Sequence, residues 1–213
     1  MGKYDWFLYG FFGIIIGLFS RKGYGFWKKE DGDKVFKKKL GVLGPSGSGK
    51  THFLRYLKDG SISTKYVPTP LMKEEIKSIE LIKNGKTLIL ERTEDLPGDD
   101  ISIELYYGEF IKSCSHIFFL FNCNDFIRES NYRNHTIGMI KFVLKRNKPI
   151  VFLGTHIDVF QGINGNESER KNAQGKIIKY LSDKIPVDKF KHFEVINMKQ
   201  INELEIIKEN LFK

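Results

Sequence analysis

Short apolar runs alternate with segments of helical periodicity along most of the chain, from about residue 35 to its end. Apolar runs of about four to eight residues are typical of buried strands, and apolar residues three or four apart are typical of helices. We expect six strands, at Phe36–Leu43, Glu75–Ile82, Lys86–Arg92, Ile117–Asn122, Pro149–Thr155 and His192–Ile196. We expect five helices, at Thr51–Lys58, Ile101–Ser113, Thr136–Arg146, Gln174–Lys184 and Glu203–Phe212. This alternation predicts an α/β fold with a mostly parallel sheet and helices on both of its faces.

One pair of strands departs from the parallel arrangement. Only Lys83-Asn84-Gly85 separates the second expected strand from the third, and Asn-Gly is a strong signal for a tight hairpin turn. We therefore expect these two strands to be antiparallel, with one of them at the edge of the sheet. The polar stretch from Gln161 to Ala173 is predicted to be a loop.

The start of the chain has a different pattern. Residues 6–19 carry no charge and are mostly apolar; as a helix they would span about 21 Å, less than the roughly 30 Å hydrocarbon core of a bilayer. Three interpretations compete: a cleaved signal peptide, a helix buried against protein, and a membrane anchor. Asp5 and the bulky aromatic residues fit a signal peptide poorly. Flanking Trp6, Arg21 and Lys22 favour an anchor helix of residues 1–20, which either spans the membrane or lies in its interface.

The distribution of charge supports the same interpretation. Of the formal net charge of +9, +5 lies between Arg21 and Lys39, where there are eight basic and three acidic residues. A basic run directly after an apolar one suits anionic lipid headgroups, at about 1 kcal/mol per basic residue near the surface, and it would hold the following domain on the cytoplasmic face. No recognised nucleic-acid motif accompanies the charge, so nucleic acid is not an expected partner. We divide the chain into an anchor (1–20), a basic linker (21–34) and a nucleotide-binding domain (35–213).

The composition is that of a soluble globular domain outside the anchor, with 41% hydrophobic and 29% charged residues in 213. The two cysteines, Cys114 and Cys123, lie inside apolar stretches without a C-x-x-C pattern, so we expect them to be buried and reduced. None of the five histidines has metal-ligand spacing to a cysteine or another histidine, and a zinc site is not expected.

Directly after the first expected strand, residues 44–51 read Gly-Pro-Ser-Gly-Ser-Gly-Lys-Thr. This is the G-x-x-x-x-G-K-T pattern of a phosphate-binding loop, whose glycines let backbone N–H groups converge on phosphate oxygens. Lys50 would reach the β- and γ-phosphates, and the Thr51 hydroxyl would bind Mg²⁺. The helix that begins here adds its positive N-terminal end. The chain is therefore predicted to bind a nucleoside triphosphate.

Two further motifs follow later strands. Asp95 and Gly98 form a D-x-x-G after the hairpin, where a carboxylate can hold Mg²⁺ and a glycine N–H can meet the γ-phosphate. Thr155-His156-Ile157-Asp158 lies at the end of the fifth expected strand, the edge at which open α/β sheets bind ligands. A carboxylate such as that of Asp158 accepts two hydrogen bonds from guanine, from N1–H and the exocyclic amine, and adenine lacks this pattern.

In this order and spacing, the motifs resemble those of the Ras-like small GTPases, over roughly Phe36 to Lys213. The resemblance implies a P-loop NTPase fold with a six-stranded sheet, GTP or GDP with Mg²⁺ as ligands, and GTP hydrolysis. Thr69, 19 residues after Lys50 (69 − 50), then matches the switch threonine that ligates Mg²⁺ only with triphosphate bound. Asn197-Met198-Lys199 resembles the loop whose backbone reads the guanine oxygen.

The resemblance also implies a role for each site residue. The nucleotide would be bound by Gly44, Ser46, Gly47, Ser48, Gly49, Lys50, Thr51, His52, Gly98, Thr155, His156, Asp158, Met198 and Lys199. Mg²⁺ would be held by Thr51, Thr69 and Asp95. The residues implied in catalysis are Lys50, Thr69 and Asp99.

Some positions depart from the family pattern. His156 replaces the usual lysine beside the base, and Asp99 stands where many relatives have the glutamine that orients the attacking water, so we expect slow hydrolysis. Within the family, the combination of an N-terminal apolar segment with the sequence Asp95-Leu96-Pro97-Gly98 is similar to the pattern in the Arf-like β-subunits of the signal recognition particle receptor. The threonine at position 155 is more similar to the pattern in Rho-type members. The expected function is a membrane-tethered GTPase switch that acts on a protein partner. The alternatives are a P-loop ATPase and a nucleotide-bound scaffold without hydrolysis.

Overall fold

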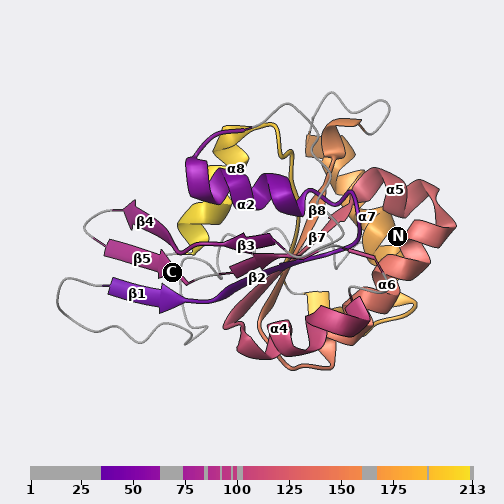
Figure 1. Cartoon of the computed structure of the whole chain (residues 1–213). Coiled ribbons are helices and arrows are strands. Elements are labelled where there is room, and N and C mark those ends of the chain that lie inside the picture. Colours follow the sequence, from indigo (N-terminus) through magenta and orange to yellow (C-terminus); the bar gives the residue numbers. More distant parts are fainter. Residues whose placement is uncertain are drawn as a thin grey trace.

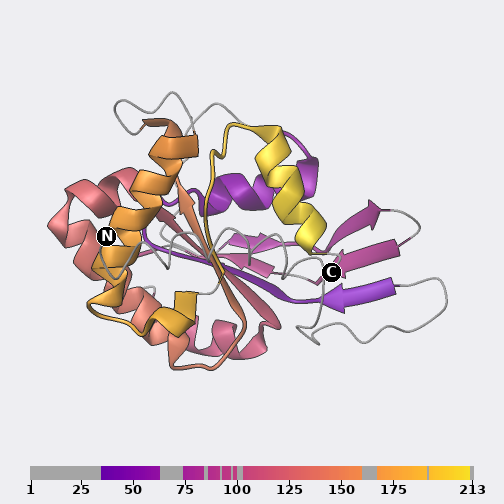
Figure 2. The same cartoon turned by 180° about the vertical axis from the view of Figure 1, so that it is seen from behind.

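Helices lie on both sides of a layer of strands in the computed structural model of the chain (Figure 1, and from behind in Figure 2). The structure describes residues 35–62, 74–83, 86–91, 93–96, 98–99, 103–159, 167–190 and 192–211. This arrangement confirms the predicted α/β class. The expected anchor, the linker and Thr69 lie outside the described residues.

The centre of the molecule is a parallel sheet with the strand order β2-β7-β8-β9. Its strands are β2 (Leu40–Leu43), β7 (His116–Asn122), β8 (Ile150–Thr155) and β9 (Phe193–Val195). Strand β7 is buried at every position after His116, as expected for a parallel strand covered on both faces. The carboxyl ends of these strands therefore converge on one edge of the molecule, where loops can form a ligand site.

Two smaller sheets adjoin this centre. One has the order β1-β5-β4, and the other pairs β3 with β6. The strands are β1 (Val35–Lys38), β3 (Glu74–Ile76), β4 (Ile79–Lys83), β5 (Lys86–Leu90) and β6 (Thr93–Asp95). Strands β4 and β5 are antiparallel, with Lys83 opposite Lys86, which confirms the predicted antiparallel pair.

The first two expected strands are interrupted, at Lys39 and at Lys77–Ser78, and the third ends at Leu90, before the separate strand β6. The described strands therefore pair as three sheets. The break at Lys39 has a clear cause, because the chain changes partner there. Lys38 pairs with β5, whereas Leu40 pairs with β7. Between them, the Lys39 carbonyl accepts from the Ser115 N–H at 2.9 Å.

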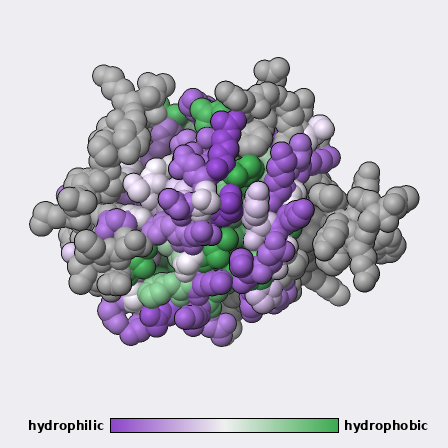
Figure 3. Space-filling view, turned by 90° about the vertical axis from the view of Figure 1, so that its right-hand side faces the viewer, coloured by the Kyte–Doolittle hydropathy of each residue, from purple (hydrophilic) through white to green (hydrophobic). Residues whose placement is uncertain are grey.

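Alternation along β7 divides the core into two parts. Phe118 and Leu120 pack in a cluster with α2 (Lys50–Asp59) and α8 (Ile201–Asn210). Phe119 and Phe121 pack in a second cluster with the helices of the opposite face. These are the π-helical turn η1 (Ile103–Tyr107), α4 (Gly108–Ser113), α5 (Cys123–Arg128), α6 (Ser130–Leu144) and α7 (Glu167–Ser182). The side of the molecule that carries α5 and α6 is largely hydrophilic in the space-filling view, with small hydrophobic patches (Figure 3).

Several helix boundaries differ from the predictions. The expected loop from Gln161 to Ala173 is wrong for its second half, because α7 already begins at Glu167. Apolar residues with helical spacing begin only at Ala173, and the turns before it are largely polar. Helix α6 likewise begins six residues before Thr136, with a polar first turn. Helix α5 was not predicted; Asn122 caps it by accepting from the N–H groups of Asn124 and Asp125.

Both cysteines are buried and free, as predicted, and each packs against a glycine. A Cβ atom placed on Gly154 would lie 2.4 Å from the Cys123 sulfur, and one on Gly41 would lie 2.9 Å from the Cys114 sulfur. Burial raises the pKa of both thiols, that of Cys114 to about 11. Within the described ranges, no helix has the length and apolar character needed to cross a membrane.

Candidate functional site

The loop between β2 and α2 has the backbone that its glycines predict. Gly44, Gly47 and Gly49 all have positive φ angles, of 143°, 73° and 90°. Gly49 directly precedes α2, and no side chain in the described part of the protein caps that helix end. A helix start without a capping side chain, directly after the loop, is an arrangement that favours an anion. Ser46 is exposed, whereas the buried Ser48 hydroxyl has no hydrogen-bond partner among the described residues.

Lys50 lies beneath this loop and is 5% exposed. Its Nζ donates to the carbonyls of Gly44 and Pro45, at 2.9 and 3.0 Å. Burial lowers the pKa of Lys50 to about 8, against the opposing effect of the Asp95 and Asp99 carboxylates. The loop therefore holds a cation whose charge is only partly compensated.

Two of the predicted magnesium ligands meet directly. The Thr51 hydroxyl donates to Asp95 Oδ2 at 2.5 Å, and Asp95 is 1% exposed. A hydroxyl and a carboxylate are hard oxygen donors of the kind that Mg²⁺ takes, usually together with waters and substrate phosphates. Within the described ranges there is no cluster of three or more histidine, cysteine or acidic residues that would hold a metal without such help. Thr69, the third predicted ligand, is not among the described residues.

The D-x-x-G glycine lies against the phosphate loop. A Cβ atom on Gly98 would be 2.4 Å from the Gly44 oxygen and 2.5 Å from the Ser46 nitrogen, so only glycine fits without a shift of backbone. The Gly98 carbonyl lies 3.2 Å from His135 Nε2 on α6. Asp99 follows it, and its carbonyl accepts from the Ile103 N–H at 3.1 Å, where η1 begins.

The same segment contacts the loop a second time, through Tyr107. This tyrosine is fully buried at the end of η1, and its hydroxyl lies 3.4 Å from the Gly44 carbonyl. Burial raises the pKa of Tyr107, so its hydroxyl stays protonated and can donate. The Gly44 carbonyl of the phosphate loop is therefore approached twice by the segment that follows Asp95, once by Gly98 and once by Tyr107.

On the other side of the loop, Thr155 joins the predicted base motif to the phosphate loop. Its side chain is fully buried at the end of β8, with Oγ1 2.9 Å from the Ser48 carbonyl and 3.1 Å from the Phe121 carbonyl. Its one hydroxyl proton serves one of these acceptors at a time. His156 Nδ1 lies 2.8 Å from the same oxygen.

Two histidines line this side of the loop. His156 has a φ of 60°, and its ring carbon Cε1 lies 3.8 Å from the position of a Cβ on Gly49. Its pKa is lowered by burial, against the opposing charge of Asp158. His52 Nε2 lies 3.3 Å from the Met198 carbonyl, and burial lowers its pKa as well. Both rings therefore favour the neutral form, which suits stacking or hydrogen bonding more than charge pairing.

Asp158 forms an ion pair with Lys199. The Asp158 carboxylate, in the short turn η2 (Ile157–Val159), lies 2.7 Å from the ammonium of Lys199. The Asp158 side chain is 17% exposed and that of Lys199 is 72% exposed, so the pair lies at the surface of the site. The structure thus brings together the two predicted base-reading positions.

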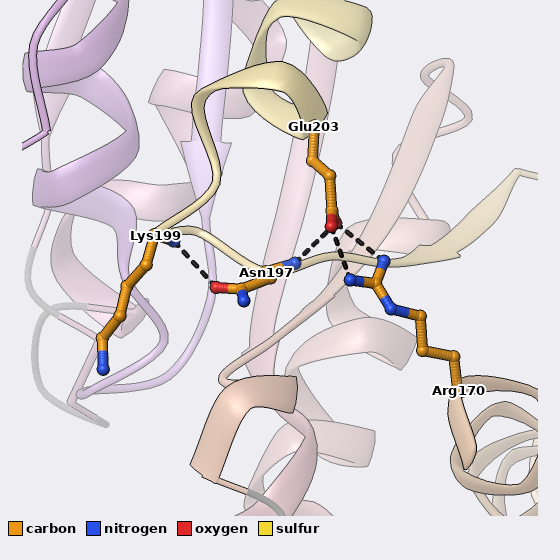
Figure 4. Close-up of polar contacts among 4 residues, drawn as sticks. All are labelled: Arg170, Asn197, Lys199 and Glu203. Atoms are coloured by element: carbon orange, nitrogen blue, oxygen red, sulfur yellow. Dashed lines mark hydrogen bonds and ion pairs between the residues drawn. The ribbon is translucent and has the colours of Figure 1, made fainter. Parts of the chain in front are cut away.

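The loop containing Asn197 is held by a network that the sequence did not reveal (Figure 4). The Asn197 N–H donates to Glu203 Oε2 at 2.8 Å, and its side-chain oxygen accepts from the Lys199 N–H at 2.9 Å. Arg170 on α7 donates to both oxygens of the same glutamate, at 2.9 and 2.5 Å. The only sequence signal for Glu203 was its place in the first turn of an expected helix, and Arg170 lay in a segment predicted to be a loop.

The predicted residues that the structure describes therefore lie around one loop. Asp95, Gly98 and Asp99 lie on one side of it, and residues 155–158 with Met198 and Lys199 lie on the other. Additional contacts around the site come from four residues that were not among the predicted site residues: His135, Tyr107, Arg170 and Glu203. No protein-family model matches this chain, and no curated protein matches it.

We predict that Gly98→Ala destabilises the protein by about 1–3 kcal/mol, because the new methyl group would overlap the backbone of the phosphate loop. Denaturant unfolding gives the change in the free energy of unfolding. Gly138→Ala on α6 is the matched control: nothing lies within 4 Å of its Cβ position, so alanine should stabilise the helix by up to about 1 kcal/mol. Equal stability of Gly98→Ala and wild type would contradict the close approach of Gly98 to the loop.

Proposed function

We propose that this protein binds GTP or GDP together with Mg²⁺, hydrolyses GTP slowly, and acts as a nucleotide-dependent switch toward a protein partner. The observation that carries the proposal is the double contact of the phosphate loop. Thr51 within it bonds to Asp95 at 2.5 Å, and the Ser48 carbonyl lies 2.9 Å from Thr155 of the predicted base motif. A nucleotide on this loop would have its phosphates on the Asp95 side and its base on the Asp158 side.

The strand arrangement supports a P-loop NTPase fold of the Ras-like kind. Consecutive strands β1 and β2 would form one strand of the proposed six-stranded sheet, as would β3 with β4 and β5 with β6. The Glu91 N–H donates to the Lys38 carbonyl at 2.8 Å, which extends the pairing of β1 with this part of the chain by one residue past the end of β5. The phosphate loop then follows a central strand and opens onto α2, as such a fold requires.

Recognition of the phosphates would rest on N–H groups and one cation. The positive-φ glycines and the first turn of α2 supply the N–H groups, and Lys50 supplies the charge. Thr51 and Asp95 would hold Mg²⁺, with Thr69 added when triphosphate is bound, and the ion would neutralise charge on the phosphates. Recognition of guanine would rest on Asp158, with Lys199 and the backbone near Met198 beside it.

Hydrolysis would be weak because of Asp99. This carboxylate takes the place of the glutamine side chain that orients the attacking water in many Ras-like GTPases. It is close enough to Lys50 that its negative charge opposes the lowering of the Lys50 pKa by burial. An anion near the γ-phosphate repels it and leaves the attacking water less well oriented.

The same feature favours the second candidate function, a scaffold that binds the nucleotide without turnover. The distinguishing experiment is to denature the purified protein, identify the released nucleotide by chromatography, and follow one turnover of bound GTP.

We also propose that residues 1–20 tether this domain to a membrane, with the basic linker against anionic lipid. The support comes from the sequence: an uncharged run at residues 6–19 followed by a stretch of net charge +5.

The first prediction on binding concerns Asp158. Asp158→Ala should weaken GTP binding by about 2–4 kcal/mol, because two guanine donors lose their acceptor. Affinity for ATP should not change, since adenine lacks that pair of donors. Asp188→Ala, an exposed acid in the turn Val187–Phe190, is the control and should bind GTP normally. A wild-type protein that prefers ATP, measured by competition with a fluorescent nucleotide, would sink the guanine assignment.

The second prediction uses the pKa of Lys50, which is about 8 in the free protein. Phosphate binding favours the ammonium form, so the bound pKa is higher and affinity must fall as pH rises through 8. Between pH 7 and 8.5 we expect about a fourfold loss in GTP affinity and increasing proton uptake on binding. Calorimetry in two buffers of different ionisation enthalpy measures that uptake.

Lys50→Ala should bind no triphosphate, and a folded Lys50→Ala protein with unchanged GTP affinity would refute the phosphate-loop assignment.

The third prediction concerns the tether. The full chain should co-sediment with vesicles containing anionic lipid and resist extraction by high salt, because salt screens the basic stretch and leaves the apolar one unaffected. A full-length protein that is soluble and monomeric without detergent or lipid would contradict the tether. It would favour packing of residues 6–19 against protein.

A further inference from the structure

One contact beside the phosphate loop, at Gly98, comes from an element that belongs to none of the predicted motifs. His135 lies on α6, and its Nε2 is 3.2 Å from the Gly98 carbonyl. Because a carbonyl accepts, Nε2 must carry a proton, as it does in one neutral tautomer and in the imidazolium form. The contact joins a helix packed against β7 to the glycine that faces the phosphate loop.

Gly98 needs such a contact more than another residue would. It has no side chain to pack, and glycine has the greatest backbone freedom of all residues. On one side its position is limited by the loop, since a Cβ would lie 2.4 Å from the Gly44 oxygen. That limit excludes movement of Gly98 toward the loop. The contact of His135, on α6, with the Gly98 carbonyl at 3.2 Å restrains this glycine from a second element.

The segment after Gly98 has its own fixed points. The Asp99 carbonyl accepts from the Ile103 N–H at 3.1 Å, and Tyr107 of η1 contacts the Gly44 carbonyl at 3.4 Å. With His135 on the Gly98 carbonyl, the carbonyls of two successive residues, Gly98 and Asp99, each have a contact that holds them. The part of α6 that carries His135 is held in place, because the neighbouring Thr136 is fully buried and its hydroxyl donates to the Tyr132 carbonyl at 2.7 Å.

We propose that His135 is a positioning residue for triphosphate recognition. By holding the Gly98 carbonyl it keeps the glycine N–H in place for the γ-phosphate, so triphosphate affinity depends on it more than diphosphate affinity does. This inference rests on the proposed function, in which Gly98 meets the γ-phosphate. A diphosphate offers that N–H no partner, and its remaining contacts with the loop, Lys50 and the base site do not involve His135.

The size of the effect follows from backbone entropy. Fixing one residue in a single conformation costs about 1–2 kcal/mol, which corresponds to a factor of about 5–30 in an equilibrium constant. Without His135 that cost falls on triphosphate binding. We therefore expect His135→Ala to lower the ratio of triphosphate to diphosphate affinity by about 5- to 30-fold.

The experiment compares GDP with a non-hydrolysable GTP analogue on full-length variants in detergent, with Mg²⁺ present, by competition against a fluorescent nucleotide. His135→Gln keeps an N–H donor at a similar reach and should restore most of the ratio. His116→Ala is the matched control, because that histidine lies at the start of β7, 3.2 Å from the Ser115 hydroxyl, away from the loop. If the alanine variant does not fold, His135→Leu keeps the bulk without the donor and should show the same loss.

The outcomes separate this inference from the function on which it rests. A wild-type protein that binds neither guanine nucleotide overturns both. A wild-type protein that binds both, with an unchanged ratio in His135→Ala and His135→Leu, overturns only the role of His135. An equal loss of both affinities, without rescue by His135→Gln, identifies a general structural role and also overturns it.

Discussion

A buried ammonium group constrains the whole region around the phosphate loop. Burial of Lys50 lowers its pKa to about 8, so the folded chain must offset a desolvation cost that a surface lysine does not have. Its hydrogen bonds go to two carbonyls of the loop itself, at Gly44 and Pro45. Carbonyls point at the lysine only if the loop curls around it, and the positive φ angles of its glycines allow that curl. The acids Asp95 and Asp99 then supply the opposite charge from a neighbouring segment.

The two sides of the loop are held by different kinds of interaction. The Asp95 side depends on close backbone approach, at Gly98, and on a tyrosine hydroxyl at a loop carbonyl. The base side depends on a buried threonine and on a surface network in which Glu203 joins α7, α8 and the Asn197 loop. The two sets of contacts reach different residues of the loop: Gly44, Ser46 and Thr51 on the first side, and Ser48 on the second. Such separation suits a site in which phosphate number changes while the base stays bound.

The sequence predicted the site wherever the signal was local. The loop, Asp95 and Thr155 were predicted because each stands at or shortly after the end of an expected strand, and strand ends converge in a parallel sheet. Arg170, Glu203 and His135 could not be found in this way, because their partners lie 33 residues, 6 residues and 37 residues away with no repeated spacing. The start of α7 was missed because its first turns are polar, and periodicity is visible only where a helix buries apolar residues. Thr69 and the anchor remain predictions from sequence.

The two cysteine–glycine contacts have a consequence for how this core can change over time. Cys123, at the start of α5, fills the space left by Gly154 on β8, and Cys114, at the end of α4, does the same for Gly41 on β2. In each pair, any larger residue at the glycine collides with sulfur, while a smaller residue at the cysteine leaves a void. Neither member can be exchanged alone without cost, but a compensating exchange conserves volume. The two residues of each pair therefore act as one packing unit, although they are far apart in the sequence. Which substitutions are tolerated at one position depends on the residue at the other.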